Sequence, residues 1–129
     1  MKKILIGGSM KFRDTIKNTM KELENIGFEP LFPNIDYTEE SRDVAETIEE
    51  KSKLVWDHLK AVEQADALYF IVPNGYMGTS CKIELGYALA LKKPIYFSET
   101  TNDMGLDCYT EGFIKLEELH EWRSILCTS

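Results

Sequence analysis

The sequence predicts an α/β fold in which a central sheet of five parallel strands lies between layers of helices. Short apolar runs that end at glycine or proline alternate with longer segments whose apolar residues recur every three or four positions. The run Asp66–Pro73 is continuously apolar after its first residue, as expected of a strand that is covered on both faces. Strands that alternate with helices form right-handed βαβ units, and these units build a parallel sheet.

The first half of the chain is expected to supply two strands and two helices. Lys3–Gly7 is the first strand, and a helix with one apolar face follows its glycines and stops at Gly27. Phe28–Phe32 is a short second strand, and its prolines favour a position at the edge of the sheet. A long helix then runs over Ser41–Ala65, capped at its start by Ser41. Its expected apolar face is Val44, Ile48, Val55, Leu59 and Val62.

The second half begins with the strand that we expect at the centre of the sheet. Its elements in order are the strand Asp66–Pro73, a helix capped by Thr79 or Ser80 that runs to Lys93, the strand Pro94–Ser98, a polar loop Glu99–Thr110, the strand Gly112–Leu116, and a closing helix with Leu119, Trp122, Ile125 and Leu126. Residues 1–129 are therefore expected to form a single three-layer, Rossmann-like or flavodoxin-like domain.

The composition indicates a small-molecule ligand. The chain has 15 Lys and Arg against 22 Asp and Glu, a net charge of −7, with no cluster of basic residues that would hold a nucleic acid polymer or a membrane surface. No apolar run approaches the about 18–20 residues of a membrane-spanning helix, so we expect a cytoplasmic protein. Cys81, Cys108 and Cys127 lack the spacing of a zinc site, and we interpret them as reduced thiols.

Ligands of parallel sheets bind beyond the carboxyl ends of the strands, which selects the loops Gly7–Arg13, Asn34–Tyr37 and Asn74–Ser80. In the first loop, Gly8, Ser9 and Lys11 are candidates to bind an anion, although an ordinary strand-to-helix turn explains the same residues. In the second loop, Asp36 is a candidate to bind a sugar hydroxyl or, equally, a turn residue. Tyrosines that either stack on a base or pack are Tyr37, Tyr76, Tyr87 and Tyr109.

The third loop brings small and hydroxyl residues close to one carboxylate. Gly75, Gly78, Thr79 and Ser80 precede Glu84, which lies about one turn into the following helix. Such a carboxylate either takes part in chemistry or is a solvated residue that the positive end of the helix favours. Glu84 is therefore the first catalytic candidate.

The strand that starts at Asp66 and the segment that starts at Glu84 resemble those of a known family. Asp66-Ala-Leu-Tyr-Phe-Ile-Val, a glycine loop and Glu84-Leu-Gly-Tyr-Ala-Leu-Ala-Leu-Lys-Lys-Pro-Ile resemble the nucleoside 2-deoxyribosyltransferase-like superfamily, which includes deoxynucleoside-monophosphate N-glycosidases. The resemblance covers roughly the first hundred residues. It implies that Glu84 attacks the anomeric carbon of the sugar and that no cofactor is needed. It also implies a homo-oligomer with sites near subunit boundaries. The apolar tail of Leu119, Trp122, Ile125 and Leu126 is a candidate to contribute to such a contact.

The resemblance places an acidic residue eight positions before Asp66, where this chain has His58 preceded by Asp57. Either residue is a candidate acid for the leaving base, and His58 alternatively is a hydrogen-bonded histidine on a helix flank. Neighbouring helical residues point about 100° apart, so we expect only one of the two to reach the site.

The loop before Glu84 departs from the family pattern. Gly78 stands where the transferases carry an Asp and the monophosphate N-glycosidases carry a phosphate-binding Ser. The phosphate-binding role has either moved to Thr79 and Ser80 or been lost. The segment is also similar to the Pro-Gly-Gly-x-Gly-Thr-x-x-Glu loop of cytokinin-nucleotide phosphoribohydrolases, with one extra residue inside and two more before Glu84.

The function expected from the sequence is cleavage or transfer of the N-glycosidic bond of a nucleoside or a nucleoside 5′-monophosphate. The alternative is a non-catalytic module that binds a nucleotide-derived ligand. The sequence leaves open the sugar, the phosphate, the base and the acceptor.

Overall fold

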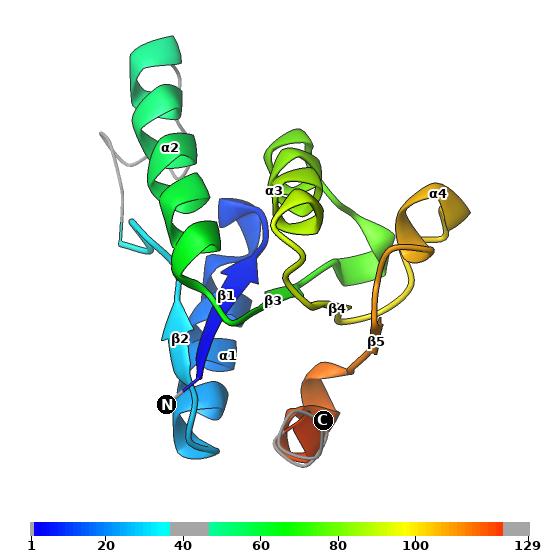
Figure 1. Cartoon of the computed structure of the whole chain (residues 1–129). Helices are drawn as coiled ribbons and strands as arrows, with labels where there is room; N and C mark the ends of the chain where they lie inside the picture. Colours follow the sequence, from blue (N-terminus) through cyan, green and yellow to red (C-terminus); the bar gives the residue numbers. More distant parts are fainter. Residues whose placement is uncertain (1, 37–46, 123–129) are drawn as a thin grey trace.

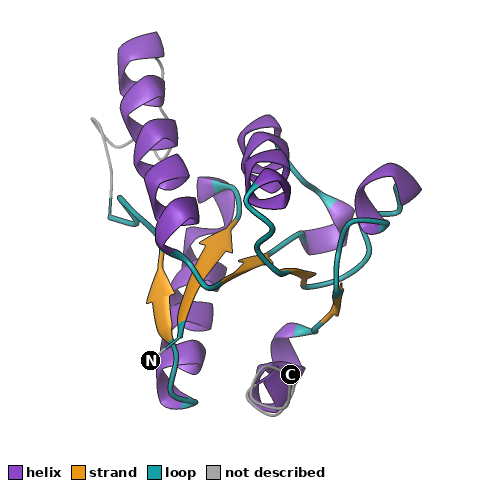
Figure 2. Cartoon of the chain, viewed as in Figure 1, coloured by secondary structure: helices purple, strands orange, loops and turns teal. Residues whose placement is uncertain are grey.

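The computed structural model describes residues 2–36 and 47–122 and shows one sheet of five parallel strands in the order β2-β1-β3-β4-β5 (Figure 1). The strands are β1 (Lys3–Gly7), β2 (Glu29–Leu31), β3 (Ala67–Phe70), β4 (Ile95–Phe97) and β5 (Gly112–Phe113). The helices are α1 (Arg13–Asn25), α2 (Ile48–Gln64), α3 (Thr79–Ala90) and the short α4 (Met104–Asp107). Turns of 3₁₀ helix lie at Met10–Phe12, Pro73–Gly75 and Leu116–Glu121 (Figure 2). The predicted α/β class, the central β3 and the edge position of β2 are confirmed.

Each face of the sheet has its own hydrophobic core. Because side chains alternate along a strand, Ile4 and Ile6 of β1 face α1 and the C-terminal segment, whereas Leu5 faces α2 and α3. Strand β3 alternates in the same way, with Tyr69 on the first face and Phe70 on the second. Figure 1 shows α2 and α3 together on one side of the sheet. The double-sided burial explains why this strand is apolar without interruption.

Two helix starts differ from the sequence prediction. Helix α2 begins at Ile48, after Thr47 accepts a hydrogen bond from the Glu50 N–H, while Ser41 lies outside the described residues. Ile48 is 84% exposed and does not belong to a buried face. Helix α3 is capped by Gly78, whose extended backbone turns the chain without a side-chain hydrogen bond. Thr79 and Ser80 are consequently its first helical residues, and the prediction that one of them caps it is wrong.

Val44, which the sequence placed on the apolar face of the helix before β3, lies outside the described residues, like Ser41.

The polar segment Glu99–Thr110 is more ordered than a simple loop, because it contains α4. The Asp107 carboxylate holds this segment by accepting hydrogen bonds from the Thr101 N–H at 2.9 Å and the Thr101 hydroxyl at 2.7 Å. In the described ranges, no helix combines the length and the apolar character that crossing a membrane requires.

The C-terminal segment closes one of the two cores. Leu119 and Trp122 are buried, and the Trp122 ring lies 5.0 Å from the ring of Tyr69 and 5.1 Å from that of Tyr96. These two side chains therefore pack within their own chain and cannot also form the subunit contact expected for them. Ile125, Leu126 and Cys127 lie outside the described residues.

Replacing Trp122 tests this core. We expect Trp122→Ala to lower the free energy of unfolding by about 3–5 kcal/mol, because the change removes a large buried ring. Trp56→Ala is the matched control, since Trp56 is 62% exposed, and should cost less than about 1 kcal/mol. Urea unfolding followed by circular dichroism measures both values. Equal losses in the two variants would contradict the packing described here.

Candidate active site

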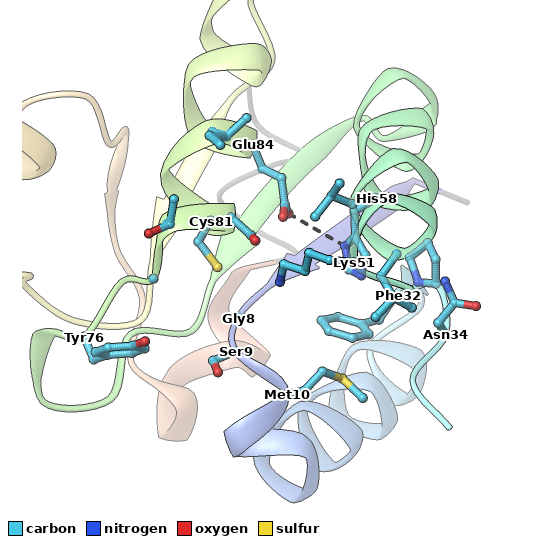
Figure 3. Close-up of a pocket in the computed structure, with 17 residues that line it drawn as sticks. Gly8, Ser9, Met10, Phe32, Asn34, Lys51, His58, Tyr76, Cys81 and Glu84 are labelled. Carbon is cyan, nitrogen blue, oxygen red and sulfur yellow. Dashed lines mark ion pairs between the residues drawn. The ribbon is translucent and has the colours of Figure 1, made fainter. Parts of the chain in front are cut away.

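A cavity of about 530 Å³ opens beyond the carboxyl ends of β1, β2 and β3, between α2 and α3 (Figure 3). It lies where ligands bind in parallel sheets, because the loops after adjacent strands meet at this edge. Its lining comes from the β1–α1 loop, the segment after β2, one face of α2 and the start of α3. The lining residues are Gly8, Ser9, Met10, Phe32, Pro33, Asn34, Lys51, Leu54, Val55, His58, Tyr76, Gly78, Thr79, Ser80, Cys81, Ile83 and Glu84.

Glu84 is the buried acid of this cavity. It is only 6% exposed, and its Oε1 atom has no hydrogen-bond partner in the structure. Burial disfavours the charged form and raises the pKa of the carboxyl from 4.5 to about 7, while the positive charge of Lys51 acts in the opposite direction. Glu84 is therefore a carboxyl that gains and loses its proton near neutral pH.

His58 of α2 lies beside this carboxyl in the cavity lining (Figure 3). Its Nδ1 atom lies 3.7 Å from Glu84 Oε1, and its side chain is 13% exposed. Burial lowers the pKa of the imidazole to about 4, and a hydrogen bond to the backbone of Pro33 works against this shift. Pro33 has no N–H, so the bond goes to its carbonyl oxygen, and Nδ1 has no partner. His58 thus donates its Nε2–H to Pro33 and presents Nδ1 to Glu84 as an acceptor.

The two residues form a pair that holds one proton near neutral pH. Either the Glu84 carboxyl keeps the proton and points it at Nδ1, or the proton moves to His58 and leaves a carboxylate beside an imidazolium. Burial favours the first arrangement, because it contains no charge. The Phe32 ring packs in a T-shaped arrangement with the imidazole, at 4.6 Å between centroids, and helps to exclude water from this pair.

Asp57, the other candidate acid, does not line the cavity. Its carboxylate accepts a hydrogen bond from the Asn34 side-chain amide at 2.8 Å and pairs with Lys53 at 3.3 Å. These partners lower the pKa of Asp57, the Asn34 hydrogen bond most. Since Asn34 itself lines the cavity, Asp57 touches the site only through that side chain.

Among the binding residues expected from the sequence, Gly8, Ser9, Gly78, Thr79 and Ser80 line the cavity. They come from two loops that are far apart in sequence and are brought together because β1 and β3 are neighbouring strands. Ser9 also accepts a hydrogen bond from the Lys11 N–H and so caps the turn that starts α1.

Lys11, Asp36 and Gly75 do not line it. The Lys11 ammonium lies 4.9 Å from the centre of the Tyr76 ring, and Asp36 pairs with Lys17 at 2.9 Å on the surface. Gly75 has a φ of +83°, and a Cβ there would lie 2.9 Å from the Thr101 carbonyl oxygen, so this glycine is needed for its turn.

Sequence reasoning missed several lining residues, chief among them Lys51. Lys51 lies seven residues before His58, which is two helical turns and therefore the same face of α2, so the spacing alone could have indicated it. Phe32 and Asn34 come from the segment after β2; Asn34 opens the loop Asn34–Tyr37 that the sequence selected, but the residues named as ligand candidates there were Asp36 and Tyr37.

Cys81 and the candidate tyrosines show no arrangement that points to a catalytic role. Burial raises the pKa of the Cys81 thiol to about 12, so Cys81 is a neutral neighbour of the cavity at ordinary pH. Of the candidate tyrosines, Tyr76 lines the cavity, Tyr87 donates a hydrogen bond to Glu63, and Tyr37 lies outside the described residues. Tyr109 is exposed and does not line the cavity. Within residues 2–36 and 47–122, no group of three His, Cys, Asp or Glu side chains is placed to hold a metal ion.

The raised pKa of Glu84 predicts a pH-dependent stability. The folded protein binds this proton more tightly than the unfolded chain, so the contribution of Glu84 is full below pH about 4.5 and is lost as pH rises through about 7. The loss amounts to about 3 kcal/mol. Because glutamine does not titrate, the stability of Glu84→Gln relative to wild type should rise by up to this amount between about pH 5 and pH 8.

Urea unfolding of both proteins across this pH range measures the difference. His58 titrates with the opposite sign, but it is present in both proteins and cancels to first order. A stability difference that stays constant with pH would contradict the raised pKa of Glu84.

The sequence matches a known protein family. The family model described as nucleoside 2-deoxyribosyltransferase matches residues 6–117. No curated protein matches the chain significantly.

Among the solved structures that match the chain, two illustrate the shared fold. The 2-deoxyribosyltransferase of the psychrotolerant bacterium Bacillus psychrosaccharolyticus superposes with a TM-score of 0.69 at 15% identity, over 92% of this chain and 90% of that one. A conserved protein from Enterococcus faecalis V583 superposes with a TM-score of 0.63 at 12% identity, over 94% of this chain and 96% of that one. The family model covers most of the sequence, and these structures have the same architecture. The chain therefore belongs to the nucleoside 2-deoxyribosyltransferase family.

Proposed function

We propose that this chain cleaves or transfers the N-glycosidic bond of a nucleoside or a nucleoside 5′-monophosphate, with Glu84 as the nucleophile. The observation that carries the proposal is the buried Glu84 carboxyl, which has no hydrogen-bond partner on Oε1 and lies at the wall of the cavity. Burying a polar group without a partner costs folding free energy, and such groups are found at functional sites more often than elsewhere. Membership of the family supports the same chemistry.

The reaction begins with the proton of Glu84. His58 Nδ1 accepts this proton, which leaves a carboxylate that attacks the anomeric carbon of the sugar. A bond forms between Glu84 and the anomeric carbon while the bond from that carbon to the base nitrogen breaks. The base departs with the electron pair and takes a proton from water. The carboxylate also opposes the positive charge that develops on the sugar ring.

The second step releases the sugar from Glu84. Water, or the nitrogen of a second base, attacks the anomeric carbon from the face that the first base has left, and the bond to Glu84 breaks. The proton that the attacking water or base N–H loses neutralises the hydroxide that remained when the first base took a proton from water. The imidazolium of His58 faces the departing carboxylate and stabilises its negative charge. The proton then returns to Glu84, so the enzyme is restored. In this proposal His58 carries a proton for Glu84 rather than for the leaving base.

Base release is the direct test of the nucleophile. Deoxyribonucleosides, ribonucleosides and their 5′-monophosphates are incubated with the protein, with and without an acceptor base, and free base is measured by chromatography. We expect release by wild type and a loss of at least about 1000-fold in both Glu84→Ala and Glu84→Gln. The panel also identifies the sugar and the acceptor.

Two outcomes would contradict this role. Release that persists in both variants would exclude Glu84 as nucleophile. No release from any compound, together with a nucleotide-dependent rise in melting temperature, would favour a non-catalytic module that binds a nucleotide-derived ligand.

The pH profile tests the pair of Glu84 and His58. Because the reaction uses the form in which Glu84 and His58 share one proton, kcat/KM should fall as pH rises through about 7, where the pair loses that proton, and should also fall below about pH 4, where His58 is protonated as well. His58→Gln removes the proton acceptor but keeps a polar side chain, and we expect kcat to fall by about 100-fold with a much smaller change in KM. A rise in KM with unchanged kcat would instead show that His58 only shapes the cavity.

A further inference from the structure

Lys51 is the one Lys or Arg side chain that lines the cavity in the part of the chain that the structure describes. Figure 3 shows it reaching from α2 into the space between the Gly8–Ser9 loop and Glu84. Within the described ranges its ammonium forms no ion pair. Other lysines of the chain are used locally: Lys17 pairs with Asp36, and Lys53 pairs with Asp57. Lys51 thus presents a free positive charge to whatever enters.

The charge of the cavity follows from its titratable groups. Burial favours the neutral forms of both Glu84 and His58, so Lys51 supplies the charge of the lining. Its field reaches the back wall, because it lowers the pKa of Glu84, His58 and Cys81 alike. The chain as a whole carries a net charge of −7. A positively charged cavity attracts an anionic ligand, whereas a neutral ligand gains no such attraction.

The residues that share the cavity with Lys51 are those that suit a phosphate monoester. The hydroxyl residues Thr79 and Ser80 line the cavity, and the N-terminus of the 12-residue α3 opens there without a side-chain cap on Gly78. The unpartnered Oε1 of Glu84, one turn further along α3, marks where the reacting sugar would lie. A phosphate monoester carries a charge of about −1.5 to −2 near pH 7 and binds lysine as a point charge.

We propose that Lys51 makes this chain selective for nucleoside 5′-monophosphates over nucleosides, by pairing with the 5′-phosphate. The inference rests on the proposed N-glycosidic chemistry at Glu84 and deepens it by naming the substrate class. A neutral nucleoside gives the ammonium no charged partner, whereas the phosphate replaces the water around it with a charge-assisted hydrogen bond.

The ratio of kcat/KM for a deoxynucleoside 5′-monophosphate to kcat/KM for the same deoxynucleoside tests the proposal. Both substrates react with the same Glu84, so any effect of Lys51 on the pKa of that carboxyl cancels in the ratio. Wild type should prefer the monophosphate, and Lys51→Met should reduce the ratio about 10- to 100-fold, mainly through KM. The preference of wild type should also weaken as salt is added.

Lys60→Met is the matched control, because Lys60 is an exposed lysine of the same helix that does not line the cavity. Its ratio should equal that of wild type. A wild-type preference for the nucleoside would overturn the proposal. An unchanged ratio in Lys51→Met would overturn it as well. If kcat/KM fell equally for both substrates, Lys51 would act on the pKa of Glu84 instead.

Binding to the Glu84→Gln protein separates this inference from the proposed chemistry. We expect the monophosphate to raise its melting temperature more than the nucleoside does, and the excess to vanish when Lys51→Met is added. This result without any base release by wild type would contradict the chemistry and leave the role of Lys51 intact. Stabilisation by inorganic phosphate alone, equal to that by the monophosphate, would overturn the assignment to a substrate phosphate.

Discussion

The candidate site depends on one constraint, the burial of the Glu84 carboxyl opposite the His58 imidazole at 3.7 Å. Burial disfavours the charged form of each group. It therefore raises the pKa of Glu84 to about 7 and lowers the pKa of His58 to about 4. One proton then serves both residues. Ionisation of Glu84 lowers the free energy of unfolding by about 3 kcal/mol. The resulting carboxylate is poorly solvated and therefore reactive.

The sheet order creates the conditions for this pair. Strands β1 and β3 are hydrogen-bonded neighbours, so the glycine loop after β1 and the start of α3 meet at one edge. Helices α2 and α3 pack on the same face and bring His58 and Glu84 together from positions 26 residues apart, the difference between 84 and 58. Phe32, from the segment after β2, closes the remaining side against the imidazole. Each element thus contributes one wall of a cavity that no single motif could form.

The candidate site was only partly accessible to sequence reasoning. Glu84 stood out because its glycine-rich loop and the following helix resemble a family motif, and His58 because of its spacing from Asp66. The choice between His58 and Asp57 needed the rotation of α2, which turns Asp57 toward Asn34 and Lys53. Lys51 shares the His58 face by helical spacing, so the spacing could have indicated it once His58 was a candidate, although a lysine on a charged helix does not stand out by itself.

The sequence by itself determined the order of the elements, the buried centre at β3 and the edge position of β2. Apolar periodicity and proline placement are local properties, and every residue needed to recognise them lies within its own segment. Only the tertiary structure decided that Trp122 closes a core, that Gly78 caps α3 and that Glu84 keeps its proton near neutral pH. Burial and protonation depend on neighbours contributed by distant parts of the chain, and these neighbours exist only once the strands have assembled.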